Sequence, residues 1–331
     1  MSFEKIRGHQ KTLELLNRMV KTKRLAHAYV FSGLEGIGKR LTALALAKNL
    51  LCSSGNEKSC GHCSACIQVD RGSHPDLFII EPEKNAITID GIRSLKRELS
   101  RKSFAGGYKA CIINGADKMN VHAGNALLKT LEEPTPETVI ILITGQPYRL
   151  LPTILSRCQH IRFQPLSLFD TSELVMAETG VGKDDAILMA SLTGGSPGKA
   201  LTFKVEYLKV LRDSWVRQSR FFTKVDKEKF FIGEEKFLSD KENIDLKLNL
   251  LRLWCRDLVI HRIYGNTEFI LNTDKAEEVA SQSSAFSLEK LLNTLLGIEE
   301  YSQAFEYNVN PQFTFDALLM LLHPKNERFL Q

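Results

Sequence analysis

The sequence GLEGIGKR, residues 33–40, matches the phosphate-binding pattern G-x-x-x-x-G-K through Gly33, Gly38 and Lys39. The next position normally carries Ser or Thr, whose hydroxyl helps to hold Mg²⁺, but here it is Arg40. The residues before the loop are β-branched and aromatic and predict a buried strand, and those after it are rich in Ala and Leu and predict a helix. A strand, a glycine-rich turn and a helix N-terminus together surround phosphate with backbone N–H groups. The sequence therefore predicts a phosphate-binding loop that has lost one metal-binding group.

A second loss follows at the end of another predicted strand. Residues 110–113 form an apolar run of the kind that normally ends in acidic residues for the metal and the attacking water. Here the run is followed by Asn114 and Gly115. Because the two losses fall on opposite walls of one site, we expect a nucleotide fold that no longer hydrolyses nucleotide. Whether the loop still binds a nucleotide without turnover stays open.

Four of the seven cysteines are clustered with the spacing C-x7-C-x2-C-x2-C. In a chain that starts without a secretion signal, this spacing is typical of a tetrahedral Zn²⁺ site rather than of disulfides. Four thiolates complete the coordination of the ion, so the site would be structural, although His62 is an alternative ligand. The predicted ligands are Cys52, Cys60, Cys63 and Cys66. The remaining three cysteines, which have apolar neighbours, are Cys111, Cys158 and Cys255.

Length and charge limit the class of protein. A chain of 331 residues has room for two or three domains, and its net charge of +5 permits contact with nucleic acid without requiring it. The first ten residues, MSFEKIRGHQ, lack the apolar core of a signal peptide, and no apolar run is long enough to span a bilayer. We therefore expect a cytoplasmic protein without membrane contact.

Short apolar runs continue after the cysteines and alternate with helical patterns. This alternation predicts a parallel sheet covered by helices on both faces. The pattern stops near Pro165, and almost every later segment is predicted to be helical. A glycine-rich turn, GGSPGKAL, lies at residues 194–201, and residues 246–263 predict a core helix. The strands are predicted at residues 27–32, 77–80, 110–114, 139–144 and 160–163, and the helices between them at residues 41–51, 90–100 and 121–133.

Several motifs give the chain a resemblance to a known family. The sequence NALLKTLEEP at residues 125–134, followed by Ser156-Arg157-Cys158, closely resembles the bacterial clamp-loader subunits of DNA polymerase III, which belong to the AAA+ family. The chain looks most like the δ′ type, which shares a zinc module after the phosphate-loop helix and the turn His74-Pro75-Asp76. A segment at residues 310–312, reading NPQ, opens the last helix of the family. The resemblance is dense over the first half of the chain and weak over the C-terminal helices.

The resemblance implies a fold and a domain organisation. It implies an α/β AAA+ domain with a RecA-like parallel sheet at residues 1–165, carrying the zinc module near residues 52–66. A small helical lid domain at residues 166–204 would follow. A C-terminal all-α collar domain would occupy residues 205–331.

The resemblance also assigns site residues unevenly. The acidic pair of the active subunits falls on Asn114 and Gly115, and their arginine that senses the γ-phosphate falls on Gly198, beside Lys199. The motif Ser156-Arg157-Cys158 is complete, and its arginine is a finger offered in trans to ATP bound by the neighbouring subunit. A planar, permanently charged guanidinium suits this task because it can contact two phosphate oxygens at once. The alternative is that Arg157 only braces its own domain through Glu132 or Glu133.

The implied function is that of a non-hydrolysing clamp-loader subunit of the DNA polymerase III holoenzyme in replication. Its partners would be the γ/τ-type ATPase subunits, the δ subunit, the sliding clamp and primer–template DNA. DNA phosphate could be contacted by Lys129 or by the basic group Lys21, Lys23 and Arg24. Two other classes stay open: a working ATPase rescued by Asp76 or Asp117, and a stand-alone zinc-containing DNA-binding protein. Absence of basic–aromatic alternation around the cysteines argues against the second of these.

Overall fold

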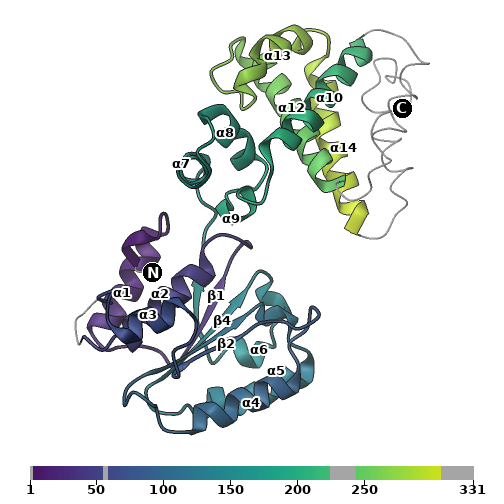
Figure 1. The fold of residues 1–331 in the computed structure, drawn as a ribbon. Coiled ribbons are helices and arrows are strands. Elements are labelled where there is room, and N and C mark those ends of the chain that lie inside the picture. Colours follow the sequence, from purple (N-terminus) through teal and green to yellow (C-terminus); the bar gives the residue numbers. More distant parts are fainter. Residues whose placement is uncertain (1–2, 55–58, 224–243, 307–331) are drawn as a thin grey trace. The chain divides into compact units, whose positions relative to one another are not determined.

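The computed structural model describes residues 3–54, 59–223 and 244–306 (Figure 1). The chain divides into two compact units. The first comprises the described residues up to Leu174 together with Gly195–Lys199, and the second comprises Val175–Gly194 and the described residues from Ala200 onward. The three-domain division drawn from the sequence stays a prediction.

The first unit is built on a five-stranded, wholly parallel sheet in the order β2-β3-β4-β1-β5 (Figure 1). This confirms the α/β fold with a parallel sheet, and each strand lies within a residue of its predicted range. The register runs through Val30, which pairs with Leu142 on one side and with His160 on the other. The strands are β1 (Ala28–Ser32), β2 (Leu77–Ile80), β3 (Lys109–Asn114), β4 (Thr138–Thr144) and β5 (Gln159–Arg162).

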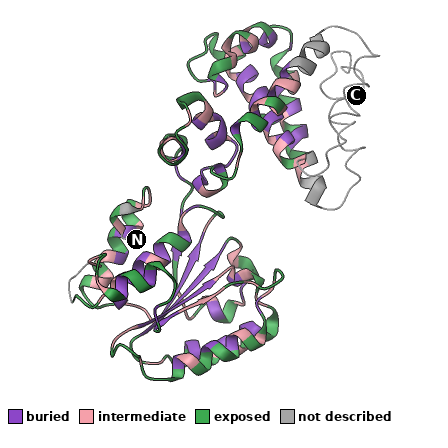
Figure 2. Cartoon of the chain, viewed as in Figure 1, coloured by how far each residue is buried: buried purple, intermediate pink, exposed green. Residues whose placement is uncertain are grey.

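Burial explains why the central strands have no polar–apolar alternation. Every residue of β1 and β4 is buried, as expected of strands covered on both faces (Figure 2). At the sheet edge, β5 buries only Ile161. Successive side chains of β1 enter opposite layers, because Tyr29 and Phe31 join one apolar core and Ala28 and Val30 join the other.

Helices cover both faces of this sheet. On one side α1, α2 and α3 pack over the strands, and on the other side α4 and α5 lie together (Figure 1). The order of chain segments is the predicted alternation of strand and helix. The helical segments of this region are η1 (Phe3–Lys5), α1 (Gln10–Lys21), α2 (Lys39–Leu51), α3 (Ser64–Asp70), α4 (Ile89–Ser100), η2 (Ala116–Lys118), α5 (Val121–Glu132), η3 (Pro147–Arg149) and α6 (Pro152–Leu155).

The described part of the second unit is helical. Its longest helix, α12 (Ile244–Tyr264), contains the predicted core helix and contacts α10, α13 and α14. Trp254, which is 2% exposed, lies at the centre of this unit and donates a hydrogen bond from Nε1 to Gln282 (3.1 Å). The other helical segments that follow the sheet, within the described residues, are α7 (Leu168–Thr179), α8 (Lys183–Ser191), α9 (Pro197–Ala200), α10 (Val205–Thr223), η5 (Thr273–Lys275), α13 (Ala276–Ser283) and α14 (Leu288–Glu306).

Two predictions fall outside this description. The NPQ segment at residues 310–312 and the last helix that follows it lie beyond the described residues. Within the described ranges, every helix is either too short or too polar to cross a membrane.

Candidate functional site

The predicted phosphate-binding loop lies where the sequence places it. It leaves the carboxyl end of β1, which lies between β4 and the edge strand β5, and enters α2 at Lys39. Gly38 caps the helix with a φ of 104°, a conformation that residues with a Cβ rarely adopt. The strand, turn and helix are therefore arranged as in phosphate-binding loops, with the N-terminus of α2 directed at the turn.

The lysine of this loop is bonded to the loop itself. Lys39 is 6% exposed, and its Nζ donates hydrogen bonds to the carbonyl oxygens of Gly33 and Leu34, both at 2.6 Å. Burial lowers the pKa of Lys39 to about 8, against the opposing influence of Glu35 and Asp117. A phosphate group entering the loop would have to compete with two carbonyl groups for this ammonium.

A second contact closes the loop from outside. The glycine-rich turn at residues 194–201 returns to it, where Gly198 N–H donates to the Gly36 carbonyl (2.9 Å) and Ser196 Oγ donates to the Glu35 carbonyl (2.6 Å). A Cβ added to Gly198 would lie 2.7 Å from both the Cα and the carbonyl oxygen of Gly36. No side chain fits at position 198 while the loop keeps this conformation. The sequence did not indicate this contact, since glycine-rich turns are common without such a partner.

The end of β3, where active subunits of this type carry acidic residues, has Asn114 and Gly115 instead, and the two nearby candidate acids are hydrogen-bonded. Asn114 ends β3, and Gly115 follows in the left-handed conformation with a φ of 67°. Of the two acids considered as substitutes, Asp117 accepts a hydrogen bond from Thr144 Oγ1 (2.6 Å), and Asp76 accepts three hydrogen bonds from the loop after α4. Both carboxylates therefore hold their own chain.

The arginine that replaces the metal-binding hydroxyl is paired with a glutamate. Arg40 Nη2 forms an ion pair with Glu81, just beyond β2, at 2.8 Å. Both side chains are about half exposed, so the pair adds little stability. It does place a guanidinium, rather than a hydroxyl, beside the first turn of α2.

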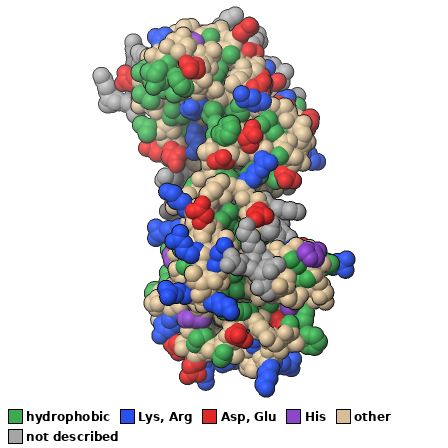
Figure 3. All heavy atoms as spheres, turned by 90° about the vertical axis from the view of Figure 1, so that its left-hand side faces the viewer, with side chains coloured by type: hydrophobic (Ala, Val, Ile, Leu, Met, Phe, Trp, Pro, Cys, Tyr) green, Lys and Arg blue, Asp and Glu red, His purple; other side chains and the backbone are tan. Residues whose placement is uncertain are grey.

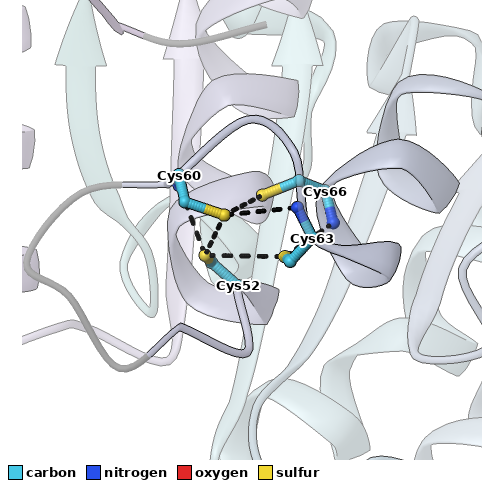
Figure 4. Close-up of side chains that lie close together, drawn as sticks. All are labelled: Cys52, Cys60, Cys63 and Cys66. Atoms are coloured by element: carbon cyan, nitrogen blue, oxygen red, sulfur yellow. Dashed lines mark hydrogen bonds between the residues drawn. The ribbon is translucent and has the colours of Figure 1, made fainter.

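The four clustered cysteines come together in space, as predicted. Their Sγ atoms all lie within 4.8 Å of one another (Figure 4). Three of the separations are 3.7 Å (Cys52–Cys60), 3.9 Å (Cys52–Cys63) and 4.0 Å (Cys60–Cys66). A tetrahedral ion with Zn–S bonds of about 2.3 Å has S–S edges of about 3.8 Å, so the cluster can hold a metal ion such as zinc. His62 does not take part, because its Nδ1 contacts the Cys60 carbonyl.

The surroundings of the thiols favour a bound cation. Backbone N–H groups of Cys60, Cys63 and Cys66 approach the sulfur atoms of Cys52, Cys60 and Cys63, each at 3.4 Å. A hydrogen bond from the Ser53 side chain lowers the pKa of Cys63 to about 5, and burial raises the pKa of Cys66 to about 12. Four thiolates this close repel one another, so a cation is needed for all four to be deprotonated together.

The cysteine cluster is separated from the phosphate-binding loop by the length of α2. Cys52 follows the last residue of α2, whereas the loop precedes its first residue. A helix of 13 residues is about 20 Å long, so a metal held here cannot reach a phosphate at the loop. The module is fastened to α2 by Lys48, which is 2% exposed and pairs with Asp70 of α3 at 2.5 Å.

Arg157 lies on the other side of the sheet, in the turn between α6 and β5. Its Nη2 forms an ion pair with Glu132 Oε1 (2.8 Å), and its Nη1 donates to the Thr153 carbonyl (3.0 Å) and Ser156 Oγ (3.3 Å). The side chain remains 37% exposed. Of the two candidate brace partners it is therefore Glu132 that pairs with Arg157. The third residue of the motif, Cys158, is half-buried, and burial raises the pKa of its thiol to about 11.

The sheet separates Arg157 from the loop of its own chain. The loop follows the carboxyl end of β1, whereas Arg157 precedes the amino end of the neighbouring parallel strand β5. Tyr29 pairs with Gln159 and Ser32 with Arg162, so the paired part of the two strands is three residue steps, or about 10 Å, long from its amino end to its carboxyl end. Lys39 therefore lies beyond the carboxyl ends of these strands and Arg157 lies before their amino ends, so the two residues do not form one site.

The basic residues considered for DNA contact do not form one surface. Lys21, Lys23 and Arg24 are exposed around the end of α1, whereas Lys129 is exposed on α5, which covers the opposite face of the sheet. Figure 3 shows basic side chains interspersed with acidic ones over the face that it displays. The geometry therefore gives no preference for DNA contact at these residues.

Comparisons with known proteins agree on one family. The family model described as DNA polymerase III, delta subunit matches residues 8–167. The Bacillus subtilis protein named DNA polymerase III subunit delta' is 31% identical over 319 residues, covering 94% of this chain and 95% of that one. The Pseudomonas aeruginosa protein of the same name is 47% identical over 136 residues, covering 40% and 42% of the two chains. The Bacillus subtilis DNA polymerase III subunit tau is 26% identical over 342 residues, covering 96% and 61%.

Proposed function

The chain belongs to the family of DNA polymerase III delta′ subunits, and from this membership we propose that it is a non-hydrolysing clamp-loader subunit that acts on its neighbour's ATP. In this role Arg157 stabilises the charge that gathers on the γ-phosphate oxygens of ATP bound to the adjacent subunit. Arginine fingers supplied in trans raise hydrolysis rates by about 10³–10⁵ in other systems.

The observation that carries the proposal is the position of Arg157 relative to its own loop. Arg157 precedes the amino end of β5, whereas the loop follows the carboxyl end of β1, and about 10 Å of paired strand lies between these ends. The Arg157 side chain is more than a third exposed. An arginine so placed cannot serve a nucleotide in its own chain. It can serve a nucleotide presented by another chain at the amino end of β5.

The state of the loop supports the absence of turnover in this chain. Lys39 is bonded to loop carbonyls, Gly198 touches Gly36, and Arg40 replaces the hydroxyl that would hold Mg²⁺. Asn114 and Gly115 also supply no carboxylate at the two positions where the active subunits carry the acids for the metal and the attacking water. These features argue against the working ATPase considered from the sequence, although Asp117 lies near enough to raise the pKa of Lys39.

The proposed partners follow from the same role. The chain would sit at one end of a ring next to a γ/τ-type ATPase subunit, with the δ subunit, the sliding clamp and primer–template DNA in the full complex. The four cysteines would hold one structural Zn²⁺, because four thiolates complete its coordination and the cluster lies at the far end of α2 from the loop. The zinc would stabilise the module between α2 and α3.

The test is a comparison of reconstituted complexes. We expect the complex built with Arg157→Ala to assemble normally but to lose DNA-stimulated ATP hydrolysis at the adjoining site and to load clamps poorly. Arg157→Lys should restore only part of the rate, since an ammonium keeps the charge without the fork. Arg101→Ala is a matched control, because Arg101 also pairs with a glutamate, Glu98, at 2.9 Å on the surface. Wild-type hydrolysis and loading by the Arg157→Ala complex would sink the proposal.

A further inference from the structure

The contacts of Arg157 hold its side chain in one direction without covering it. Two guanidinium nitrogens have partners: Nη1 contacts the Thr153 carbonyl and Ser156 Oγ, and Nη2 contacts Glu132. In the described part of the chain, Nε–H has no partner. Arginine carries five N–H donors in a fixed planar fork, so donors remain for a phosphate while the others hold the side chain in place.

We propose that Glu132 is the positioning residue of this chain, which holds Arg157 in the orientation that it needs to meet the neighbour's ATP. The inference rests on the proposed function, since it presupposes that Arg157 acts in trans. Glu132 itself touches no phosphate and acts only through Arg157.

Both partners are fixed by packed backbones, so their separation is set before any neighbour arrives. Glu132 ends α5, whose Leu127 and Leu131 are buried in the core beneath α4 and α5. Arg157 follows α6, whose Ile154 is buried in the same core. The two helices pack closely. A Cβ built on Gly124 of α5 would lie 3.0 Å from the side chain of Leu151, the residue that precedes α6. The ion pair therefore joins two rigid elements.

An ion pair of this strength can orient the Arg157 side chain without preventing it from moving. Glu132 and Arg157 are 49% and 37% exposed, and exposed pairs of this kind contribute about 0.2–1 kcal/mol. A free arginine side chain has about 2 kcal/mol of rotamer entropy to lose when it binds a phosphate. A weak, pre-formed pair removes part of that loss and still lets the guanidinium shift toward a phosphate.

The test uses the full clamp-loader complex and measures kcat and KM for ATP during DNA-stimulated hydrolysis. Glu132→Gln keeps the shape of the side chain and removes its charge. We expect it to lower kcat by a factor of about 1.4 to 5, which corresponds to the energy of an exposed ion pair, with KM for ATP unchanged. Glu132→Asp, which keeps the charge, should lie between wild type and Glu132→Gln.

Controls separate positioning from general stability. Glu133→Gln changes the next residue, whose carboxylate makes no hydrogen bond or ion pair among the described residues, and Glu98→Gln breaks the comparable surface pair with Arg101. Neither should change kcat. In an Arg157→Ala background, Glu132→Gln should cause no further loss, because its effect passes through the arginine.

The outcomes distinguish the inference from the function beneath it. If Arg157→Ala lowers the rate and Glu132→Gln does not, the positioning role fails and the finger stands. If Glu132→Gln lowers the rate equally with and without Arg157, its role is structural and the inference fails. A rise in rate on Glu132→Gln would show that the pair restrains the finger, which also overturns the inference. If Arg157→Ala changes nothing, the proposed function itself fails.

Discussion

Lys39 is a buried cation whose hydrogen-bond partners are uncharged carbonyl groups, and this makes its contribution to stability depend on pH. Burial lowers its pKa in the folded chain to about 8, from about 10.5 in the unfolded chain. Between these values the unfolded chain binds a proton that the folded chain does not. The free energy of unfolding should therefore rise with pH across that window.

The measurement compares wild type with Lys39→Met by urea unfolding from pH 7.5 to 10. The stability of wild type relative to Lys39→Met should increase as pH rises above 8, by at most about 3 kcal/mol for the full window. Lysines elsewhere titrate in both proteins and cancel. A difference that stays constant over this range would show that the Lys39 ammonium is not buried as described.

Gly198 allows a second prediction about a single residue. Gly198→Ala adds a Cβ at 2.7 Å from two backbone atoms of Gly36, so either the loop or the turn must move. We expect a loss of about 1–3 kcal/mol in the free energy of unfolding. Gly107→Ala is the control, since nothing lies within 4 Å of a Cβ there. Equal stability of the two variants would contradict the close approach.

At the scale of elements, the cysteine module should depend on metal. We expect one Zn²⁺ per chain by elemental analysis, and Cys63→Ser should reduce both the metal content and the thermal midpoint, the latter by roughly 4–8 °C for a loss of about 2 kcal/mol. His62→Ala should keep the metal, because His62 bonds to the Cys60 carbonyl and lies outside the cluster. Metal-free protein of unchanged stability would rule out a structural zinc site.

The loop after α4 depends on a single buried carboxylate. Asp76, 3% exposed, accepts hydrogen bonds from Ser103 Oγ (3.1 Å), Phe104 N–H (2.8 Å) and Ala105 N–H (2.9 Å). We expect Asp76→Asn to lower the free energy of unfolding by about 1–3 kcal/mol, because an amide offers one acceptor where three donors converge. Amide exchange at Phe104 and Ala105 should speed up. Asp90→Asn, on an 84% exposed side chain, should change neither quantity.

At the scale of the whole molecule, the isolated chain should not hydrolyse ATP. The double change Arg40→Thr with Asn114→Asp restores two of the expected groups, yet we expect no Mg²⁺-dependent turnover above background. Position 115 would still have no acidic side chain, and Gly198 would still lie against Gly36 of the loop. A τ-type subunit from the same host serves as the positive control. Steady hydrolysis by the isolated wild-type chain, abolished by Lys39→Ala, would revive the ATPase hypothesis.

Much of the first unit could be predicted from local patterns. Buried parallel strands are continuous apolar runs, so β1, β3 and β4 stood out, and the strand before a glycine-rich turn located the loop. The cysteine cluster was equally predictable, because ligands separated by two residues can bind one ion from a single turn of chain.

Contacts between distant segments could not be predicted in the same way. The approach of Gly198 to Gly36 joins residues 162 positions apart, and neither glycine indicates its partner. Glu132 and Glu133 are identical in type and adjacent in sequence, and only the direction of α5 relative to α6 determines which one meets Arg157. Asp76 could be recognised from the sequence as part of a turn, but the three groups that donate hydrogen bonds to its carboxylate lie more than 25 residues away in the sequence.

The contact between Gly198 and Gly36 also limits how the chain could evolve. A lineage that acquired arginine at position 198 before the loop opened would meet a steric clash, and one that opened the loop first would lose the hydrogen bonds that hold it. The close approach of Gly198 to Gly36 therefore opposes an arginine at position 198 for as long as the loop keeps this conformation. A single substitution to arginine at this position should therefore cost stability before it could bring any catalytic gain.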